Sequence, residues 1–297
     1  MDSKVIHSFL LIADTGNITK AAHLLHYAQS TLSAQMQQLE REVGFPLFDR
    51  IGNNIKLTNF GVAFYSYARQ IDNIVEQIST IQTDPDKISG KLNIGVAESL
   101  LLSSVIDIIP RYRTIYPQIE IQLKSGPSVA FIVDSLKQNI FDLVYVSHNL
   151  NRDPQLTCHY KRKESIIFVT QPSHPLASQK KIPLKHLFSF LFIGMERTGY
   201  LNQQLEHLAR KVGATPQFSV IVENLTVVLK ILKNYGGIAL LPVYSVRDEL
   251  SEGSLVTIDV DMPPQEYYSQ VLMNAKKWIS PYAAAFIELI KEYAPER

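Results

Sequence analysis

The residues best suited to chemistry in this chain are uncharged polar side chains between positions 29 and 37. On a helix these positions would share an exposed face that offers hydrogen-bond donors and acceptors without formal charge. Amide side chains match the adenine edge, and threonine or alanine can contact a thymine methyl group. The predicted surface would therefore read A·T-rich half-sites in double-stranded DNA. Its residues are Gln29, Ser30, Thr31, Ser33, Ala34 and Gln37.

Charge alone does not indicate nucleic-acid binding in the same region. Residues 1–60 carry five Lys or Arg and five Asp or Glu, whereas phosphate contacts normally supply most of the affinity for DNA. A few contacts to the DNA backbone would therefore have to supply the affinity and position the chain on the DNA. The expected contacts to the DNA backbone and minor groove are Thr19, Lys20, Arg50, Asn53, Asn54, Lys56 and Thr58.

Short helices joined by a tight turn would position these side chains. One predicted helix lies near the N-terminus, a second begins at Thr19, and a third runs from Gln29 to a stop at Gly44. A Gly-Asn-Asn turn between short extended pieces then predicts a β-wing. Residues 1–58 are therefore expected to form a winged helix-turn-helix DNA-binding domain.

Large apolar residues recur after this segment at alternating spacings of four and three. Such a pattern is typical of a coiled-coil helix and predicts dimerisation through residues 59–83. The alternative is a helix that packs on its own domain. Asp-Pro and Gly predict a hinge at residues 84–90. The heptad positions are Phe60, Phe64, Tyr67, Ile71, Ile74, Ile78 and Ile81.

Residues 91–297 alternate between strand-like and helix-like segments. Strands separated by helices of this length predict parallel sheets with crossover connections. Two lobes fit the length, lobe I at about 91–161 and 268–297 and lobe II at about 162–267. The expected fold is α+β and multidomain, with a long coiled-coil linker helix between a winged helix-turn-helix and a two-lobed α/β domain.

Several segments resemble the LysR-type transcriptional regulators. In the DNA-binding half they are "FLLIADTGNITKAAHLLH", "AQSTLSAQMQQLEREVGFPLFDR" and "IKLTNFG". In the second half "GKLNIGV", "FDLVYV", "VTQPSHPLA" and "NYGGIALLP" follow in the order expected for that family's effector domain. The resemblance covers essentially the whole chain. It implies a ligand-responsive transcription factor whose C-terminal domain is similar to periplasmic binding proteins.

The resemblance also implies a small-molecule effector between the lobes and no other cofactor. In such folds ligands bind where strands end and helices begin. Each serine there could instead be a plain helix cap. Acidic residues flank the site and Arg197 is the one nearby cation in sequence, so an amino acid, a small polar metabolite and an organic acid all fit. The matching positions are Ser99, Leu100, Ser128, Val129, Ser147, Arg197, Thr198, Gly199, Tyr200, Asn224 and Thr226.

The sequence departs from the family pattern on the DNA-binding surface. Ala28 stands where the family usually has Ser, and Ala34 and Gln37 stand where basic residues are frequent. Asn53 and Asn54 occupy wing positions often taken by Arg. Each change removes a phosphate contact or a guanine reader, so a single subunit is expected to bind DNA weakly. Homodimers or homotetramers would supply the missing affinity.

Other function classes receive less support. Cys158 and His159 are adjacent on an extended segment and would point apart, which argues against a nucleophile and its base. The His residues lack metal-ligand spacing, and no apolar run of about 18 residues predicts a membrane span. We therefore expect a cytoplasmic protein that is not an enzyme, with RNA polymerase as a further partner. The charged run 161–164 is expected to be a solvated segment that crosses between the lobes, the alternative being that it faces a partner subunit.

Two other classes stay open at this point. One is a solute-binding or metabolic enzyme domain with an N-terminal dimerisation module, which would require a catalytic constellation. The other is an architectural DNA-binding protein without a ligand, which would leave the predicted two-lobed domain without a role.

Overall fold

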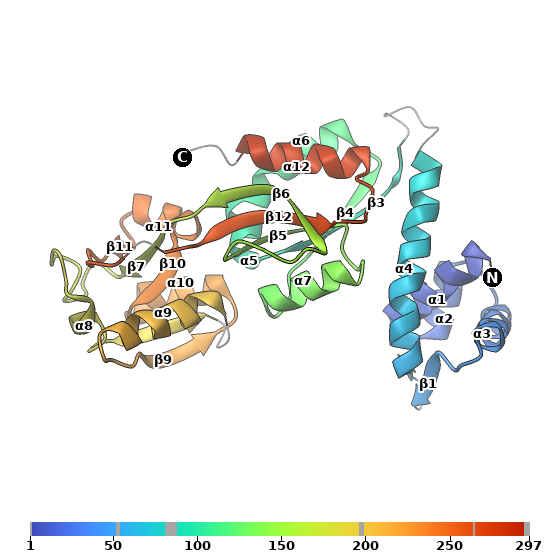
Figure 1. The fold of residues 1–297 in the computed structure, drawn as a ribbon, viewed down its shortest axis with the longest axis horizontal. Helices are drawn as coiled ribbons and strands as arrows, with labels where there is room; N and C mark the ends of the chain where they lie inside the picture. Colours follow the sequence, from blue (N-terminus) through green and yellow to red (C-terminus); the bar gives the residue numbers. More distant parts are fainter. Residues whose placement is uncertain (1, 52–53, 81–87, 196–198, 264, 294–297) are drawn as a thin grey trace. The chain divides into compact units, whose positions relative to one another are not determined.

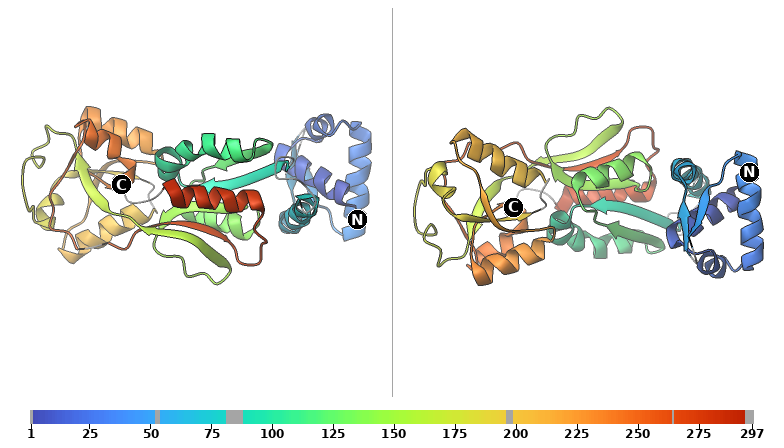
Figure 2. Two further views of the ribbon diagram at one scale, coloured as in Figure 1. Left: turned by 90° about the horizontal axis from the view of Figure 1, so that it is seen from above. Right: turned by 90° about the horizontal axis from the view of Figure 1, so that it is seen from below.

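The computed structural model describes residues 2–51, 54–80, 88–195, 199–263 and 265–293. The chain divides into two compact units, with the main boundary between Gly90 and Lys91. Figures 1 and 2 show the elements of each unit, and each unit is described separately below. None of the described helices is both long and apolar enough to cross a membrane.

The first unit consists of helices and a two-stranded wing. Its elements are α1 (Ser3–Thr15), α2 (Ile18–Leu24), α3 (Gln29–Val43), β1 (Phe48–Ile51), β2 (Asn54–Leu57) and α4 (Asn59–Thr80). Asp2 caps α1 by accepting from the Lys4 N–H, and Asn17 caps α2 by accepting from the Lys20 N–H. Gly44 ends α3 in the left-handed conformation, which favours glycine. The predicted helices and wing are confirmed.

The core of this unit is built around Phe9, whose side chain is fully buried. Its ring lies 5.1 Å from that of Phe48 in the wing and 4.9 Å from that of Phe64 in α4, the latter edge-on. Ala21 and Ala22 are also buried, and their small side chains let α2 approach its neighbours closely. One hydrophobic cluster thus joins helix-turn-helix, wing and α4.

Lobe I of the second unit is a five-stranded sheet in the order β4-β3-β5-β12-β6. Helices α6 and α12 cover one face and α7 covers the other (Figure 1). The strands are β3 (Gly90–Val96), β4 (Ile119–Lys124), β5 (Leu143–His148), β6 (Leu156–Lys163) and β12 (Tyr268–Asn274). The helices are α5 (Glu98–Leu100), the π-helix η2 (Leu101–Val105), α6 (Ile106–Ile115), α7 (Val129–Lys137) and α12 (Pro281–Tyr293).

Lobe II contains a three-stranded sheet, β10-β7-β11, and a pair, β8-β9, joined by a bridge between Phe192 and Ile238. Its strands are β7 (Ile166–Thr170), β8 (Leu191–Met195), β9 (Gln217–Val222), β10 (Ala239–Pro242) and β11 (Val256–Thr257). Its helices are α8 (Leu184–Leu187), α9 (Tyr200–Lys211), α10 (Leu225–Tyr235), the 3₁₀ turn η3 (Val243–Ser245) and α11 (Arg247–Ser251).

The expectation of parallel sheets was only partly right. β3 pairs with β5, and β8 with β9, in parallel as crossover connections require. β12 instead runs antiparallel to both β5 and β6. The chain leaves lobe I at the end of β6 and returns from lobe II at the start of β12, where Tyr268 pairs with Lys163, so β12 runs back along β6 in the opposite direction.

The charged run that was expected to be solvated is partly buried. Glu164 lies at the exit from β6 and is 8% exposed. Its Oε1 accepts hydrogen bonds from the Ser269 hydroxyl at 2.6 Å and from Arg162 Nε at 2.8 Å. A buried carboxylate requires such donors. The two strands that cross between the lobes are therefore tied together where they leave the sheet.

Candidate nucleic-acid interface and ligand cleft

Helix α3 has one buried face and one exposed face. Leu32, Met36 and Leu39 are buried in the core of the first unit. The predicted base-reading side chains lie on the other face, where Ser33 is half-buried and the rest are exposed: Gln29, Ser30, Thr31, Ala34 and Gln37. This set is called the polar face of α3. Its amide and hydroxyl groups face away from the core that the apolar residues form.

The predicted phosphate contacts divide into exposed and structurally engaged residues. Thr19, Lys20 and Lys56 are exposed. The Thr58 hydroxyl donates to the Pro46 carbonyl at 2.7 Å and accepts from the Gly61 N–H at 2.9 Å. Thr58 is thus already used to join the end of the wing to the start of α4.

The remaining predicted DNA contacts are Arg50, Asn53 and Asn54. Asn53 lies outside the described residues, while Arg50 in β1 pairs with Ile55 and Asn54 in β2 pairs with Ile51. At the base of the wing, Glu40 Oε1 accepts from the N–H groups of Leu47 at 2.8 Å and Phe48 at 3.2 Å. Sequence reasoning placed Glu40 in a family motif but did not foresee this role, which fixes the wing to the end of α3.

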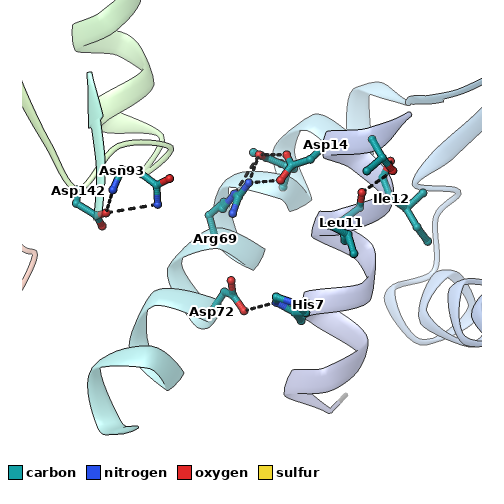
Figure 3. Close-up of polar contacts among 10 residues, drawn as sticks. His7, Leu11, Ile12, Asp14, Arg69, Asp72, Asn93 and Asp142 are labelled. Carbon is teal, nitrogen blue, oxygen red and sulfur yellow. Dashed lines mark hydrogen bonds and ion pairs between the residues drawn. The ribbon is translucent and has the colours of Figure 1, made fainter. Parts of the chain in front are cut away.

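Polar contacts fix α4 against α1 (Figure 3). Arg69 Nη2 donates to the Asp14 carboxylate, and His7 Nδ1 lies 3.3 Å from Asp72 Oδ1. The Tyr65 hydroxyl donates to Asp14 Oδ1 at 2.7 Å. Burial raises the pKa of Tyr65 to about 12, so the hydroxyl keeps its proton at neutral pH. The direction of α4 relative to the polar face of α3 is therefore set within one domain.

The heptad residues of α4 lie on two faces rather than one. Phe64 and Ile71 pack against the core of their own domain, beside the buried Ala68. Exposed apolar side chains form a second row at seven-residue intervals, here called the α4 stripe: Phe60 (52% exposed), Tyr67 (65%) and Ile74 (53%). Ile78 lies in α4, and Ile81 lies outside the described residues. For Phe64 and Ile71 the alternative of a helix that packs on its own domain is therefore correct.

The second unit contains a cavity of about 490 Å³ between the helix N-termini of its two lobes. Seven of the predicted effector residues line it: Ser99, Ser128, Val129, Ser147, Gly199, Tyr200 and Asn224. Leu100 is fully buried and Thr226 is exposed, and neither lines the cavity. Arg197 and Thr198 lie outside the described residues. The cavity volume fits a small metabolite.

Sequence reasoning missed further lining residues, including Ser125, Met195, Ser245 and Tyr267. Tyr267 lies in the segment that returns from lobe II to lobe I, and its ring stacks on that of Tyr200 at a centroid distance of 5.4 Å. No local motif marks these positions, because they meet only when the lobes come together. Among the described residues, no three His, Cys, Asp or Glu side chains could hold a metal ion together.

The serines of the cleft have different roles. Ser128 caps α7 by accepting from the Phe131 N–H at 3.1 Å, as the cap alternative proposed. Ser99 and Ser147 instead contact the hydroxyl of Tyr244, at 3.3 Å and 2.7 Å. Tyr244 belongs to η3 in lobe II, whereas both serines belong to lobe I. Burial raises the pKa of Tyr244, so its hydroxyl stays protonated and links the two lobes through these cavity serines.

Replacing Tyr244 with Phe should destabilise the second unit. The variant leaves the buried hydroxyls of Ser99 and Ser147 without this partner, which costs about 1–3 kcal/mol. Chemical denaturation of the full chain, followed by a probe in the second unit, measures the change. The matched control is Tyr268→Phe, whose hydroxyl bonds the exposed Glu266 carboxylate and should matter little. Equal stability of the two variants would contradict an interlobe role for Tyr244.

Comparison with known proteins identifies the two units. Residues 4–62 match the family model of the bacterial regulatory helix-turn-helix protein, lysR family, and residues 85–295 match the LysR substrate binding domain. The chain belongs to the LysR family of transcriptional regulators. LysR-family proteins bind DNA through the first region and carry an effector-binding domain in the second, so the function of this chain is regulatory rather than enzymatic.

Relatives and solved structures of the LysR family match along nearly the whole chain. The uncharacterized HTH-type transcriptional regulator YwqM of Bacillus subtilis (strain 168) is 26% identical over 98% of this chain and 99% of its own length. The HTH-type transcriptional activator CmpR of Synechocystis is also 26% identical, over 98% and 96%.

Two solved structures share the fold. A full-length OxyR variant from Pseudomonas aeruginosa has a TM-score of 0.75 at 17% identity, covering 99% of this chain and 96% of that chain. Full-length CbnR in complex with its target DNA has a TM-score of 0.67 at 19% identity, covering 99% and 100%. The LysR fold therefore extends over both units.

Proposed function

We propose that this LysR-family protein recognises A·T-rich half-sites as a homodimer or homotetramer and responds to a small molecule bound in the cavity between its lobes. RNA polymerase is a further proposed partner. A location in the cytoplasm belongs to the same proposal, because the regulator must reach its target DNA. Within this scheme the polar face of α3 contacts base edges, and the α4 stripe contacts a second copy of the chain.

The proposed recognition of DNA rests on the two faces of α3, one buried and apolar and the other exposed and polar. Its apolar residues are buried while amide and hydroxyl side chains point away from the core. Gln29 and Gln37 suit the adenine edge. Ala28 makes no side-chain cap at the start of α3, so N–H groups of the first turn can bind a DNA phosphate in its place.

The effector part rests on the cavity and on the contacts that cross it. A ligand shifts an equilibrium only if it binds one arrangement of the lobes more tightly than another. The hydroxyl of Tyr244 and the stacked rings of Tyr200 and Tyr267 join elements from different parts of the second unit. Ligand contacts at this place would therefore change the free energy of lobe closure.

One two-step experiment tests this proposal. Sites selected from random DNA by the full-length protein should contain paired A·T-rich half-sites, and a Gln29→Ala variant should relax the preference at one base pair by about 1–3 kcal/mol. A gel shift with the selected site is then repeated with a metabolite panel. Selection of no common sequence would refute the DNA-reading part. A shift that no metabolite alters would favour an architectural DNA-binding protein instead.

A further inference from the structure

We infer that Glu98 determines the ligand class of the cleft by acting as its built-in anion at the N-terminus of α10. The cavity would therefore accept a neutral or cationic group at this end and reject a carboxylate or phosphate there. The inference rests on the proposed function of the cavity as a ligand site and adds the chemical class of the ligand.

Contacts across the cavity carry the inference. Glu98 begins α5 in lobe I, directly after β3. Its Oε1 accepts from Asn224 Nδ2 at 2.7 Å, and its Oε2 accepts from the Leu225 backbone N–H at 3.1 Å. Asn224 is the N-cap of α10, an 11-residue helix in lobe II, and also accepts from the Val227 N–H through its side-chain oxygen.

This position is the one that an acidic ligand would otherwise occupy. The N-terminus of a helix carries partial positive charge and unpaired N–H donors, so it attracts anions. Here a carboxylate of the chain itself takes the amide of Asn224 and the N–H of Leu225. A ligand carboxylate would have to displace Glu98 and would then meet its negative charge at close range.

The charged side chains of the cavity also favour a neutral or cationic ligand group. Among the described lining residues, the formally charged side chains are the carboxylates of Glu98 and Glu223. The other lining groups are mainly hydroxyls, apolar side chains and the aromatic ring of Tyr267. Amines, amides and hydroxyls can donate to carboxylates and serine oxygens, and an ammonium group is also attracted to an aromatic face. The described cleft is thus suited to hydrogen-bond donors at the α10 end.

The test compares full-length wild type with Glu98→Ala and Glu98→Gln. Each is titrated with succinate and with inorganic sulfate at constant ionic strength, and binding is measured by calorimetry and by the shift in melting temperature. Glu98→Ala empties the end of α10 and should bind the anions at least about tenfold more tightly than wild type. Glu98→Gln keeps an oxygen acceptor for the Leu225 N–H, so its gain should be smaller.

Two further variants separate occupancy from charge. Glu223→Gln removes a negative charge from the same cavity without freeing the Leu225 N–H, and its anion affinity should rise much less than that of Glu98→Ala. Adding Asn224→Ala to Glu98→Ala removes the side-chain amide donor and should reduce the gained binding. The inference is overturned if the anion affinity of Glu98→Ala rises by less than about tenfold, or if that of Glu223→Gln rises as much as that of Glu98→Ala. If the wild-type protein bound no DNA in a parallel gel shift, the proposed function would be refuted, whereas the measured anion affinities of the variants would still stand.

Discussion

An Ile74→Lys variant should lose DNA binding while its winged domain stays folded. Ile74 is 53% exposed and belongs to the α4 stripe, so a lysine costs the monomer little. In a dimer built on this stripe, the same lysine would bury an unpaired charge. Separating two linked binding modules lowers apparent affinity by about 100-fold or more. Analytical ultracentrifugation and a gel shift on the same preparation measure both effects.

The control for this variant is Val62→Lys on the same helix. Val62 is 57% exposed, a value close to that of Ile74. At about 100° per residue it lies well away from the row formed by Phe60, Tyr67 and Ile74. Val62→Lys should therefore remain dimeric and bind DNA. A monomeric Ile74→Lys protein that binds DNA with full affinity would refute the role assigned to the stripe.

Replacing Gly61 with Ala should destabilise the first unit at the junction between the wing and α4. A Cβ atom at this position would lie 2.1 Å from the Leu47 carbonyl oxygen, and a backbone atom cannot move aside as a side chain can. The same carbonyl accepts from the Thr58 N–H, so the strain would spread through the join between wing and α4. We expect a loss of about 3 kcal/mol or more. This corresponds to a fall in melting temperature of roughly 10 °C or more.

Gly44→Ala is the matched control for this substitution. Gly44 has a φ of 82°, and a Cβ there would meet no atom within 4 Å. The change therefore carries only the conformational penalty of a left-handed backbone, which is about 1–2 kcal/mol. Thermal unfolding of the full chain, monitored in the first unit, compares the two. If both variants lost the same stability, the close approach of Gly61 to Leu47 would not be the cause.

The sequence predicted the first unit well because its signals are local. The stop at Gly44 and the helical spacing of Leu32, Met36 and Leu39 act within a few residues. The heptad spacing in α4 could not show that Phe64 is packed in the core while Tyr67 is exposed. A heptad pattern does not say whether an apolar residue packs against its own domain or against another chain. That distinction depends on tertiary packing.

The cleft was predicted less completely because its residues come from distant parts of the chain. The family resemblance placed Ser99, Ser147 and Asn224 in the cleft, and all three line the cavity. Nothing near Tyr244 in sequence indicates that its hydroxyl reaches Ser147, 97 residues away. The bond between Glu98 and the start of α10 likewise forms across 127 residues. Antiparallel entry of β12 was missed for the same reason, because it depends on the chain returning from lobe II.

The bonds from Asp14 to Arg69 and Tyr65 have a geometric consequence for promoters. They hold the α4 stripe and the polar face of α3 in one rigid body, together with the shared core around Phe9. In a dimer that uses the stripe, the distance between the two reading helices is then fixed by the domain itself. A change of bound metabolite would therefore leave the spacing within each pair of half-sites unaltered.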